Sequence, residues 1–412
     1  MGLFSSATSY LGIDIGTASI KMVELENYKN QARLKTYGYA DVSINILSGA
    51  IEKNNQAIAD YINDIAQKSN VQTKQVVAAL PTFSVFNFII TLPPMPKKDL
   101  SSAIKWEAKK FIPVPLEEMI LDWKILNKKK LKNVKKSKKD KDDDEKTEEM
   151  NLTNVKKDSA KQKKEEEALK TALGAVKNIS TGIDKKTETK NDDQIIKPSK
   201  SDNNYRILLT AAPKSLVARY IDIFKRAQLN LLSLETEAFA LSRSLIGNDR
   251  STVMIVDVGA TTADICIIEE GVPTLNRGID TGGEFITKTI MNSLNVNQER
   301  AEQFKRDFGL SSGGAMNVPD VIQKSLNSII NEIKYVFELY KRQGDNKIDK
   351  IVLTGGSAFL PNLPKYLSDL LDLQVVIGDP WDRIIYPLDL KPVLQEMGPR
   401  MSAAVGLAMR DI

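Results

Sequence analysis

Short runs of apolar residues alternate with polar turns along most of the chain, and their spacing predicts strands and helices in turn. Residues 10–15 and 20–25 are apolar runs joined by a Gly-Thr-Ala-Ser turn, which predicts a hairpin-like start. Apolar residues recur at helical spacing over 57–67, and residues 76–80 have the composition of a buried strand. Strands that alternate with helices in this way predict an α/β fold.

The alternation continues on both sides of a long polar stretch. The predicted elements are a strand at 86–92, a helix at 99–111, a strand at 205–212, a helix at 214–227, a strand at 231–234 and a helix at 237–245. Residues 253–258 and 263–269 then repeat the layout of the first hairpin, with an apolar strand, an Asp-x-Gly turn and a second apolar strand. This internal duplication predicts two equivalent domains.

Composition excludes several classes of protein. The chain has 412 residues, of which 42% are hydrophobic and 27% charged, so it can build buried cores. Its one cysteine, and the lack of an apolar leader before Tyr10, lead us to expect a cytosolic protein without disulfides. No apolar run reaches the roughly 18 residues that span a bilayer. Histidine is absent, which excludes imidazole zinc sites and Ser-His-Asp hydrolysis.

One long stretch differs from the rest of the chain. Residues 128–203 contain about 22 lysines and about 16 acidic residues, with almost no aromatic residues. Such a segment cannot bury enough apolar surface to offset its ordering entropy, so we predict a disordered insert. Acidic residues interleave with the lysines, and arginines and stacking aromatics are lacking, which argues against a nucleic-acid-binding arm.

The first predicted hairpin carries a turn suited to phosphate. Gly16 permits close approach of the backbone, and the turn from Thr17 to Ser19 offers successive N–H groups and two hydroxyls. Lys21 adds positive charge, and Asp14, at the end of the strand, is placed to bind Mg²⁺. The alternative is an ordinary hairpin in which Asp14 caps its own turn.

The second predicted hairpin has the same combination of residue types as the first. Asp257, Gly259, Thr261 and Thr262 supply a carboxylate, a glycine and two hydroxyls, so two such turns could hold a triphosphate and its metal from opposite sides of a cleft. A Gly-Gly element at 354–358 follows another apolar strand and lets the backbone approach a base or ribose. No Walker A or dinucleotide-binding fingerprint is present.

Four ordered motifs resemble those of a single superfamily. The two Asp-containing turns, Thr354-Gly-Gly-Ser and Ala301-Glu-Gln-Phe-Lys are similar to the phosphate, adenosine and Ala-Glu-x-x-Lys motifs of the actin, sugar kinase and Hsp70 ATPase superfamily. Within it, five further segments resemble the PilM family, the cytoplasmic actin-like proteins of bacterial type IV pilus assembly. They are Met1-Gly-Leu-Phe, Leu92-Pro-Pro-Met-Pro, the segment 106–118, Glu237-Ala-Phe-Ala-Leu and Ala404-Val-Gly-Leu-Ala. The similarity covers nearly everything except the lysine-rich insert.

The resemblance implies an α/β, actin-like ATPase fold with two duplicated domains around a nucleotide cleft. The implied divisions are 1–75 and 205–248 for domain 1 (1A), 76–127 for an inserted small domain (1C), 128–204 for the disordered insert, 249–275 and 347–412 for domain 2 (2A), and 276–346 for subdomain 2B.

The resemblance also implies ATP and Mg²⁺ as cofactors, with Asp14 and Asp257 ordering the metal ion. The residues implied to contact the nucleotide are Gly16, Thr17, Ala18, Ser19, Lys21, Gly259, Ala260, Thr261, Thr262, Gly282, Gly283, Glu302, Lys305, Gly355, Gly356 and Ser357. Glu302 and Lys305 would reach the ribose. Their spacing equally suits a solvated ion pair on a helix.

Catalysis has two candidate residues, Glu235 and Glu237, which precede the helix that would link the domains. Superfamily ATPases place a carboxylate or amide there to orient the attacking water, while the alternative for Glu237 is an acidic helix start that favours the helix dipole. The sequence does not decide between the two glutamates. We therefore expect nucleotide binding to act as a conformational switch, with slow ATP turnover at most.

In the PilM family, the groove beside the small domain binds the cytoplasmic N-terminal peptide of the inner-membrane protein PilN. The resemblance thus implies a scaffold at the cytoplasmic face of the bacterial inner membrane, associated with PilN and other pilus platform proteins, and leaves self-association open. Taken as isolated residues, Trp106 and Phe111 are expected to pack inside the small domain.

Two other functions are compatible with the same motifs. A small-molecule kinase would use the same cleft but requires a catalytic aspartate in domain 1 that the sequence does not place. An FtsA-like cell-division protein shares the inserted small domain. FtsA ends in an amphipathic membrane helix, whereas residues 402–412 predict the last helix of the core.

Overall fold

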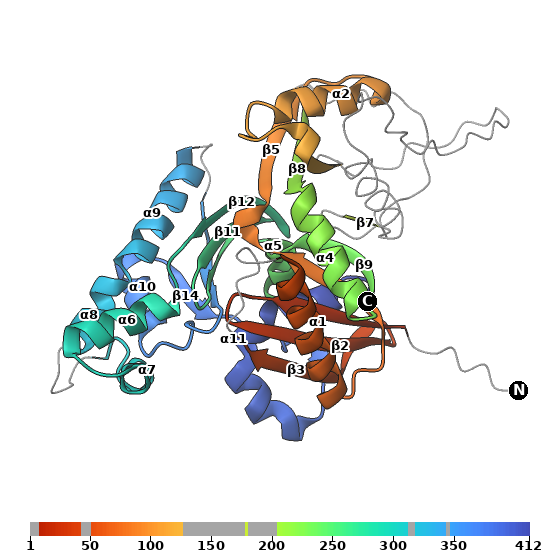
Figure 1. The fold of residues 1–412 in the computed structure, drawn as a ribbon. Helices are drawn as coiled ribbons and strands as arrows, with labels where there is room; N and C mark the ends of the chain where they lie inside the picture. The colour runs from red at the N-terminus through yellow and green to blue at the C-terminus, as the bar shows by residue number, and fades with distance from the viewer. Residues whose placement is uncertain (1–7, 43–50, 127–177, 180–203, 312–317, 343–346) are drawn as a thin grey trace, which may run out of the picture.

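Two α/β domains lie side by side, and a small three-stranded sheet rises above one of them (Figure 1). The computed structural model describes residues 8–42, 51–126, 178–179, 204–311, 318–342 and 347–412. Within these residues, no helix has the length and apolar character needed to cross a membrane.

Domain 1 is built on a seven-stranded sheet. In spatial order its strands are β15 (Ile384–Ile385), β3 (Gln31–Asp41), β2 (Ser19–Tyr28), β1 (Ser9–Ile15), β4 (Gln75–Leu80), β9 (Asn230–Thr236) and β7 (Asn178–Ile179). β1 and β2 form the predicted hairpin, and β1, β4 and β9 run parallel. Leu11 and Ile13 of β1 face the helices α1 (Ile51–Lys68) and α4 (Lys214–Arg226) in one buried core.

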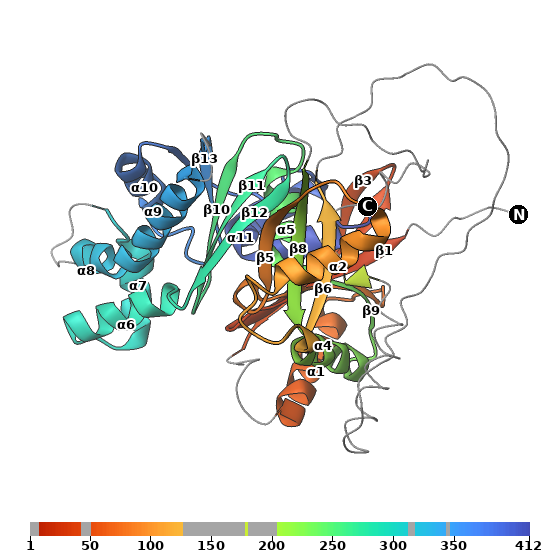
Figure 2. The ribbon, with the colours of Figure 1, turned by 90° about the horizontal axis from the view of Figure 1, so that it is seen from above.

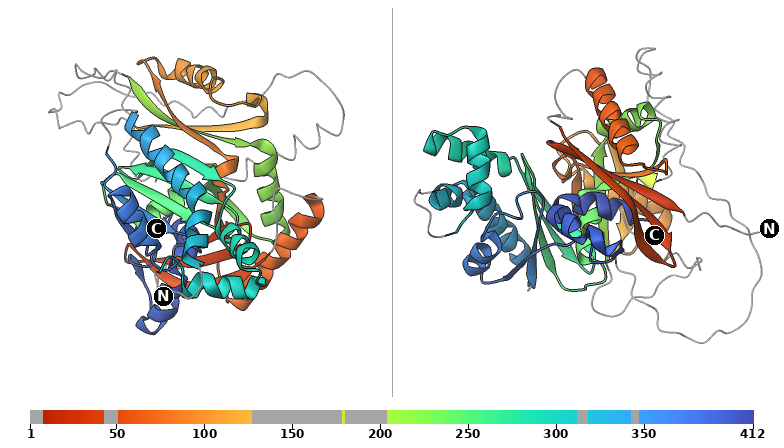
Figure 3. Two further views of the ribbon diagram at one scale, coloured as in Figure 1. Left: turned by 90° about the vertical axis from the view of Figure 1, so that its left-hand side faces the viewer. Right: turned by 90° about the horizontal axis from the view of Figure 1, so that it is seen from below.

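The other face of this sheet is covered by α11 (Lys391–Ala408). Figure 3, right panel, shows this blue helix against the red strands of domain 1. A Cβ atom at Gly12 would collide with the carbonyl oxygen of Ala404, so glycine permits the close approach of helix and strand. The predicted terminal core helix is confirmed, since Met401, Val405 and Leu407 are buried.

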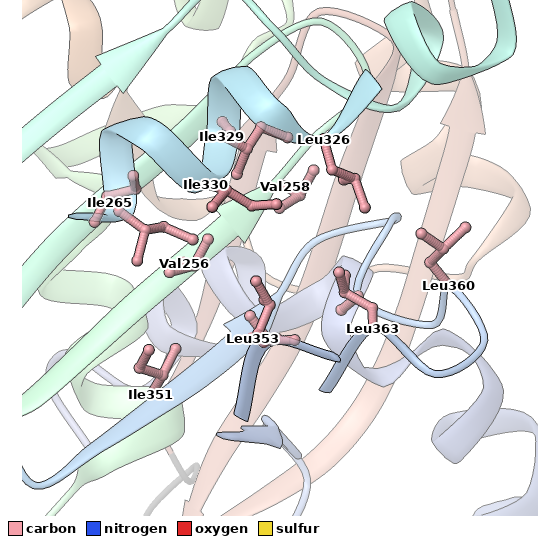
Figure 4. Packing of buried hydrophobic residues seen from close by; sticks show 14 of the residues in the cluster. Val256, Val258, Ile265, Leu326, Ile329, Ile330, Ile351, Leu353, Leu360 and Leu363 are labelled. Atoms are coloured by element: carbon pink, nitrogen blue, oxygen red, sulfur yellow. The ribbon is translucent and has the colours of Figure 1, made fainter. Parts of the chain in front are cut away.

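Domain 2 has a five-stranded sheet. Its order is β12 (Val272–Ile279), β11 (Ala263–Glu269), β10 (Val253–Val258), β13 (Lys350–Thr354) and β14 (Gln374–Ile377). The helices of this domain are α6 (Gly283–Leu294), α7 (Gln298–Asp307), α8 (Val318–Ser325), α9 (Asn327–Arg342) and α10 (Leu363–Leu371). Figure 4 shows the apolar core in which Val256 and Ile265 of the sheet lie beside Ile330 of α9.

The small subdomain consists of β5 (Phe86–Leu92), β8 (Tyr205–Pro213) and β6 (Met119–Ile125), with α2 (Lys97–Ala108) across one face (Figure 2). All pairings in this sheet are antiparallel. Short 3₁₀ helices, η1 (Thr82–Ser84) and η2 (Leu116–Glu118), precede β5 and β6. Ile90, Ile104 and Leu209 form part of its own core.

The strand pairing differs from the implied boundaries in three places. β4 falls within 76–127 but belongs to the large sheet of domain 1, and β8 falls within 205–248 but completes the small sheet. β15 and α11 fall within 347–412 but pack on domain 1. Pairing between segments distant in sequence decides these memberships, and a linear division of the chain does not contain that information.

Two other expectations concern the insert and the small subdomain. The disorder predicted over 128–204 lies outside the described residues except at Asn178–Ile179, which form β7 beside β9, and at Asn204. The predicted packing of Trp106 is wrong, because its side chain is 66% exposed. Phe111 is 52% exposed, and its ring contacts that of Phe88 at 5.0 Å between centroids. α2 buries Leu100, Ile104 and Ala108 instead.

Candidate functional site

A cavity of about 650 Å³ lies between the two domains, and both predicted hairpin turns line it. In the first turn, the Gly16 N–H donates to the carbonyl of Ser19 at 3.0 Å, and in the second the Gly259 N–H donates to that of Thr262 at 2.9 Å. The two turns therefore have the same backbone arrangement and face each other.

A hydrogen bond joins the two turns directly. The hydroxyl oxygens of Thr17 and Thr261 lie 2.7 Å apart, although the residues are 244 positions apart in the chain. The sequence predicted that both threonines contact a ligand, and the structure places them in contact with one another. Thr17 lines the cavity, whereas Thr261 closes the gap between the turns.

The first hairpin holds a buried ion pair. Lys21 Nζ lies 2.8 Å from Asp14 Oδ2, across the register pair that β1 and β2 form. Burial disfavours the charged lysine, but the carboxylates of Asp14, Asp257 and Glu237 outweigh it, so the net effect raises the pKa of Lys21. A positive charge is thus retained at the floor of the cavity.

The second hairpin places two carboxylates where the first places an ion pair. Asp257 is the register partner of Asp264, and both line the cavity. Burial, with the charge of Asp14, raises the pKa of Asp257 to about 6 against the pull of Lys21. Burial, with Asp257 and Asp280, raises the pKa of Asp264 to about 7. Asp264 received no predicted role, although its position seven residues after Asp257 matches the spacing from Asp14 to Lys21.

Of the two candidate glutamates, Glu237 lies at the cavity. It begins α5 (Glu237–Leu241), and its Oε2 accepts a hydrogen bond from Thr82 Oγ1 at 3.0 Å. Burial raises the pKa of Glu237 well above its ordinary value, and the carboxylates of Asp264, Asp14 and Asp257 raise it further. Glu237 therefore presents to the cavity a carboxyl group whose protonated form is favoured by its surroundings.

Glu235 has a different environment. It is buried at the end of β9, outside the cavity lining, and its carboxylate pairs with the guanidinium of Arg243. Arg243 also donates from Nε to the carbonyl of Gly406 at 2.9 Å, which ties the π-helix Ser242–Ile246 to α11. In the structure, Glu235 thus stabilises the packing of α5 against α11 through its ion pair with Arg243.

The N-terminus of α6 enters the same cavity. The Gly283 N–H donates to the carbonyl of Gly259 at 2.9 Å, and a Cβ at Gly282 would stand 2.6 Å from the carbonyl oxygen of Ala260. Gly283 lines the cavity and Gly282 lies behind it. Both glycines therefore let the helix start against the second turn.

Glu302 and Lys305 line the cavity as an ion pair of 2.8 Å on α7. Lys305 Nζ also donates to Thr287 Oγ1 at 2.9 Å and to the carbonyl of Gly283 at 3.2 Å. Burial opposes ionisation of Glu302, but hydrogen bonds from Lys305 and Thr287 lower its pKa overall. The pair is anchored to α6, so it is more than a solvated pair on one helix face.

The third glycine element closes the cavity from the end of β13. Gly355 has a φ of +84°, and a Cβ there would collide with Asp257 Oδ1. Gly356 and Ser357 also line the cavity. Lining residues without a predicted role include Pro81, Phe83, Arg306, Phe359, Glu396 and Arg400. They lie outside the motifs, so only their place in the fold identifies them.

The described residues contain no group of three or more carboxylate, thiol or imidazole side chains that could hold a metal ion by themselves. Asp14 and Asp257 both line the cavity, one from the end of β1 in domain 1 and the other from the end of β10 in domain 2. A donor set of one or two carboxylates suits Mg²⁺ when phosphate oxygens and water complete the shell.

Two α/β domains that face one cavity with repeated Asp-Gly hairpins form the actin-like ATPase fold, and this chain has that fold. The family model for the type IV pilus assembly protein PilM matches residues 12–140 and 185–412, and the chain belongs to that family.

Other known proteins are similar to this chain in fold or over part of the sequence. A solved structure of a PilM-PilN type IV pilus biogenesis complex is similar over 97% of this chain and 98% of that chain, with a TM-score of 0.70 and 22% identity. The cell division protein FtsA of Neisseria meningitidis is 26% identical over 234 residues, 49% of this chain and 53% of that protein. FtsA of Bacillus subtilis is 22% identical over 194 residues, 42% and 44% of the two chains. The chain spans about half the length of these curated relatives.

Proposed function

We propose that this chain is an ATP-binding scaffold of type IV pilus assembly whose nucleotide state controls docking to the N-terminal cytoplasmic peptide of a PilN-type inner-membrane protein. The observation that carries the proposal is the pair of equivalent turns that meet across one cavity through Thr17 and Thr261. Membership of the pilus assembly family supplies the biological setting.

The cavity has the groups that a nucleoside triphosphate requires. Backbone N–H groups of the two turns suit phosphate oxygens, and Lys21 supplies a buried positive charge. Asp14 and Asp257 would hold Mg²⁺, which neutralises phosphate charge when bound. Glu302 and Lys305 would hold the ribose, and Gly355 and Gly356 leave space beside the adenosine. Glu237 would orient a water molecule for slow hydrolysis.

The small subdomain has a surface suited to a peptide. Trp106, Phe111 and Val114 are exposed on α2 and the turn that follows it, and exposed aromatic residues are typical of binding energy hot spots. The solved structure with the same fold is described as a complex of PilM with PilN. We therefore place PilN-type peptide binding at this subdomain, and other platform proteins would associate through that complex at the inner membrane.

Calorimetric titration of the purified chain with a synthetic PilN-type N-terminal peptide tests the proposal. The titration is run without nucleotide, with Mg-ADP and with Mg-ATP. Saturable one-to-one binding that changes between the nucleotides is the expected result, since linkage makes the two affinities depend on each other. Trp106→Ala should weaken binding of the peptide. Tyr61→Ala, which removes an exposed aromatic side chain from α1, is the control. Absence of binding in all three states contradicts the proposal.

An FtsA-like role in cell division is the second candidate, because the curated relatives that match by sequence are FtsA proteins. Binding of the isolated chain to anionic lipid vesicles, together with no affinity for the PilN-type peptide, would favour it. The small-molecule kinase alternative would require sugar-dependent consumption of ATP, which the same purified protein can be assayed for.

A further inference from the structure

The 3₁₀ helix η1 lies where three parts of the molecule meet. It follows β4 of the large domain 1 sheet, leads directly into β5 of the small subdomain and packs against β12 of domain 2. A Cβ at Gly278 of β12 would stand 3.4 Å from the Cβ of Phe83, which shows how closely η1 approaches domain 2. Pro81 and Phe83 also line the cavity. η1 is therefore one of the described covalent links between the small subdomain and domain 1, the other being the junction of β8 with α4 at Pro213 and Lys214.

The side chain of Thr82 connects η1 to the cavity. Thr82 is 6% exposed, and its Oγ1 donates to Glu237 Oε2 at 3.0 Å, across 155 positions of sequence. Among the side-chain hydrogen bonds of the described residues, this is the one that Glu237 accepts. A buried carboxylate that loses such a donor is left with an unsatisfied oxygen, which is costly.

Other charged groups surround Glu237, and none of them replaces this donor. The titratable groups that influence it are Asp14 of β1, Lys21 of β2, Tyr220 of α4, Asp257 of β10, and Asp264 and Cys266 of β11. Three of the six are carboxylates, Lys21 already pairs with Asp14 at 2.8 Å, and the buried hydroxyl of Tyr220 makes no hydrogen bond to Glu237. The orientation of Glu237 therefore depends on the hydroxyl of Thr82.

We propose that Thr82 is a positioning residue that holds the carboxylate of Glu237 toward the cavity and relays movement of the small subdomain to it. The inference rests on the proposed function, because it assumes that Glu237 orients water and that the small subdomain docks a partner. Hydrogen bonds weaken steeply with distance and angle, so a displacement of η1 by about 1 Å is enough to release Glu237. Partner docking and hydrolysis are thereby linked through one side chain.

The test compares Thr82→Val, which keeps the shape and removes the hydroxyl, with Thr82→Ser, which keeps the hydroxyl. Ser84→Ala is the matched control, since Ser84 lies in the same turn outside the cavity lining. Thr82→Val should lower kcat for Mg-ATP hydrolysis about tenfold, the loss expected when a buried hydrogen bond is removed, and change KM by less than about twofold. Thr82→Ser and Ser84→Ala should stay within about threefold of the wild-type kcat.

A second readout does not depend on turnover. The Kd of the PilN-type peptide is measured in Mg-ADP and in Mg-ATP, and the ratio of the two values is compared between variants. The ratio should fall toward one in Thr82→Val and stay at the wild-type value in Thr82→Ser. In a Glu237→Gln background, Thr82→Val should change kcat by less than about twofold, because the two residues act as a unit. Thr82→Cys replaces Thr82→Val if thermal unfolding shows that the valine variant does not fold.

Several outcomes overturn the inference. They are an unchanged kcat and Kd ratio in Thr82→Val, equal impairment of Thr82→Ser and Thr82→Val, and additive effects with Glu237→Gln. If wild-type hydrolysis is too slow to measure, the Kd ratio alone decides. A wild-type chain that binds no Mg-ATP or no peptide overturns the proposed function and this inference with it, whereas intact binding with an unaffected Thr82→Val overturns the inference alone.

Discussion

The hairpins β1–β2 and β10–β11 have nearly the same backbone and different charges. In both, an aspartate ends the first strand and a glycine N–H bonds across the turn, at 3.0 Å in the first and 2.9 Å in the second. A Cβ at Gly16 or at Gly259 would meet a carbonyl oxygen at the same 3.2 Å. The register partner of the aspartate is Lys21 in the first hairpin and Asp264 in the second.

The difference shows that the duplicated fold conserves a shape, while one side chain per hairpin sets the charge. The first hairpin contributes a neutralised pair, and the second contributes two carboxylates whose ionisation burial opposes. A cavity lined by the two is asymmetric, with a cation on one wall and an excess of acid on the other. Such a cavity suits a polyanion that arrives with its own metal ion.

The largest expected effect is at the ion pair. Lys21→Met should leave Asp14 buried without its cation, lower the free energy of unfolding by about 3 kcal/mol and abolish Mg-ATP binding. Urea titration and calorimetry measure the two effects. Lys35→Met is the control, because Lys35 is 41% exposed and stands 3.6 Å from Glu26, so its removal should cost at most about 1 kcal/mol. Equal costs for the two variants would contradict the buried role of Lys21.

The next effect distinguishes two adjacent glycines. Gly355→Ala should lower the free energy of unfolding by about 2 kcal/mol, because alanine is strained at a φ of +84° and its Cβ would displace Asp257. Gly356→Ala is the matched control, since its Cβ would meet Arg400 Cγ at an ordinary 3.9 Å. Thermal unfolding of both variants measures the difference. A tolerated Gly355→Ala would mean that the second hairpin is less constrained than the structure shows.

A smaller effect of opposite sign is expected at Asp264. Asp264→Asn removes a like charge opposite Asp257 and should raise the free energy of unfolding at pH 8 by about 1 kcal/mol.

The pH dependence follows from the same residue. The pKa of Asp264 rises from 3.8 to about 7 in the folded state, so the folded chain binds a proton that the unfolded chain has already released. Its contribution to stability is present below about pH 4 and is lost as the pH rises through about 7. The wild-type free energy of unfolding should therefore fall between about pH 4 and pH 7, and Asp264→Asn should flatten that slope. If Asp264→Asn has the same slope as the wild type, a group other than Asp264 binds the proton on folding.

The smallest expected effect on stability comes from removing the hydrogen bond between the two turns. Thr17→Val and Thr261→Val should each lower the free energy of unfolding by about 1 kcal/mol or less. In the double variant the costs should not add, and the coupling energy should be about 0.5 to 1 kcal/mol. Additive costs in urea titrations would show that the two hydroxyls do not bond across the cavity in solution.

The sequence predicted much of the fold because its apolar runs match the elements. The strand expected at 86–92 is β5 with the same bounds, and the hairpin at 10–25 is confirmed by β1 and β2. The strand β3 has no apolar run to reveal it, since exposed or partly exposed Arg33, Lys35 and Tyr39 interrupt its buried positions. Elements of that kind depend on their neighbours for pairing.

The candidate site was also predicted only where its residues belong to a local motif. Residues within one turn, such as Asp14, Gly16 and Lys21, line the cavity together because a single local motif contains them, and their contacts with ATP and Mg²⁺ stay a prediction. Glu235 and Glu237 could not be separated by sequence. The start of α5 between them turns one toward the cavity and leaves the other beside Arg243. Thr82 has no motif and reaches Glu237 only because β4 and β9 are neighbours in the sheet.

The sequence by itself determined the α/β class, the duplicated hairpins and the glycines at their turns. These features follow from short-range physics, since backbone sterics and the period of apolar residues act within a few residues. The tertiary structure decided which charges meet, which are buried and which glutamate faces the cavity. It also decided that η1, which leads into the small subdomain, lies beside the cavity. Those properties depend on pairing between distant segments, and burial of the resulting charges sets their energies.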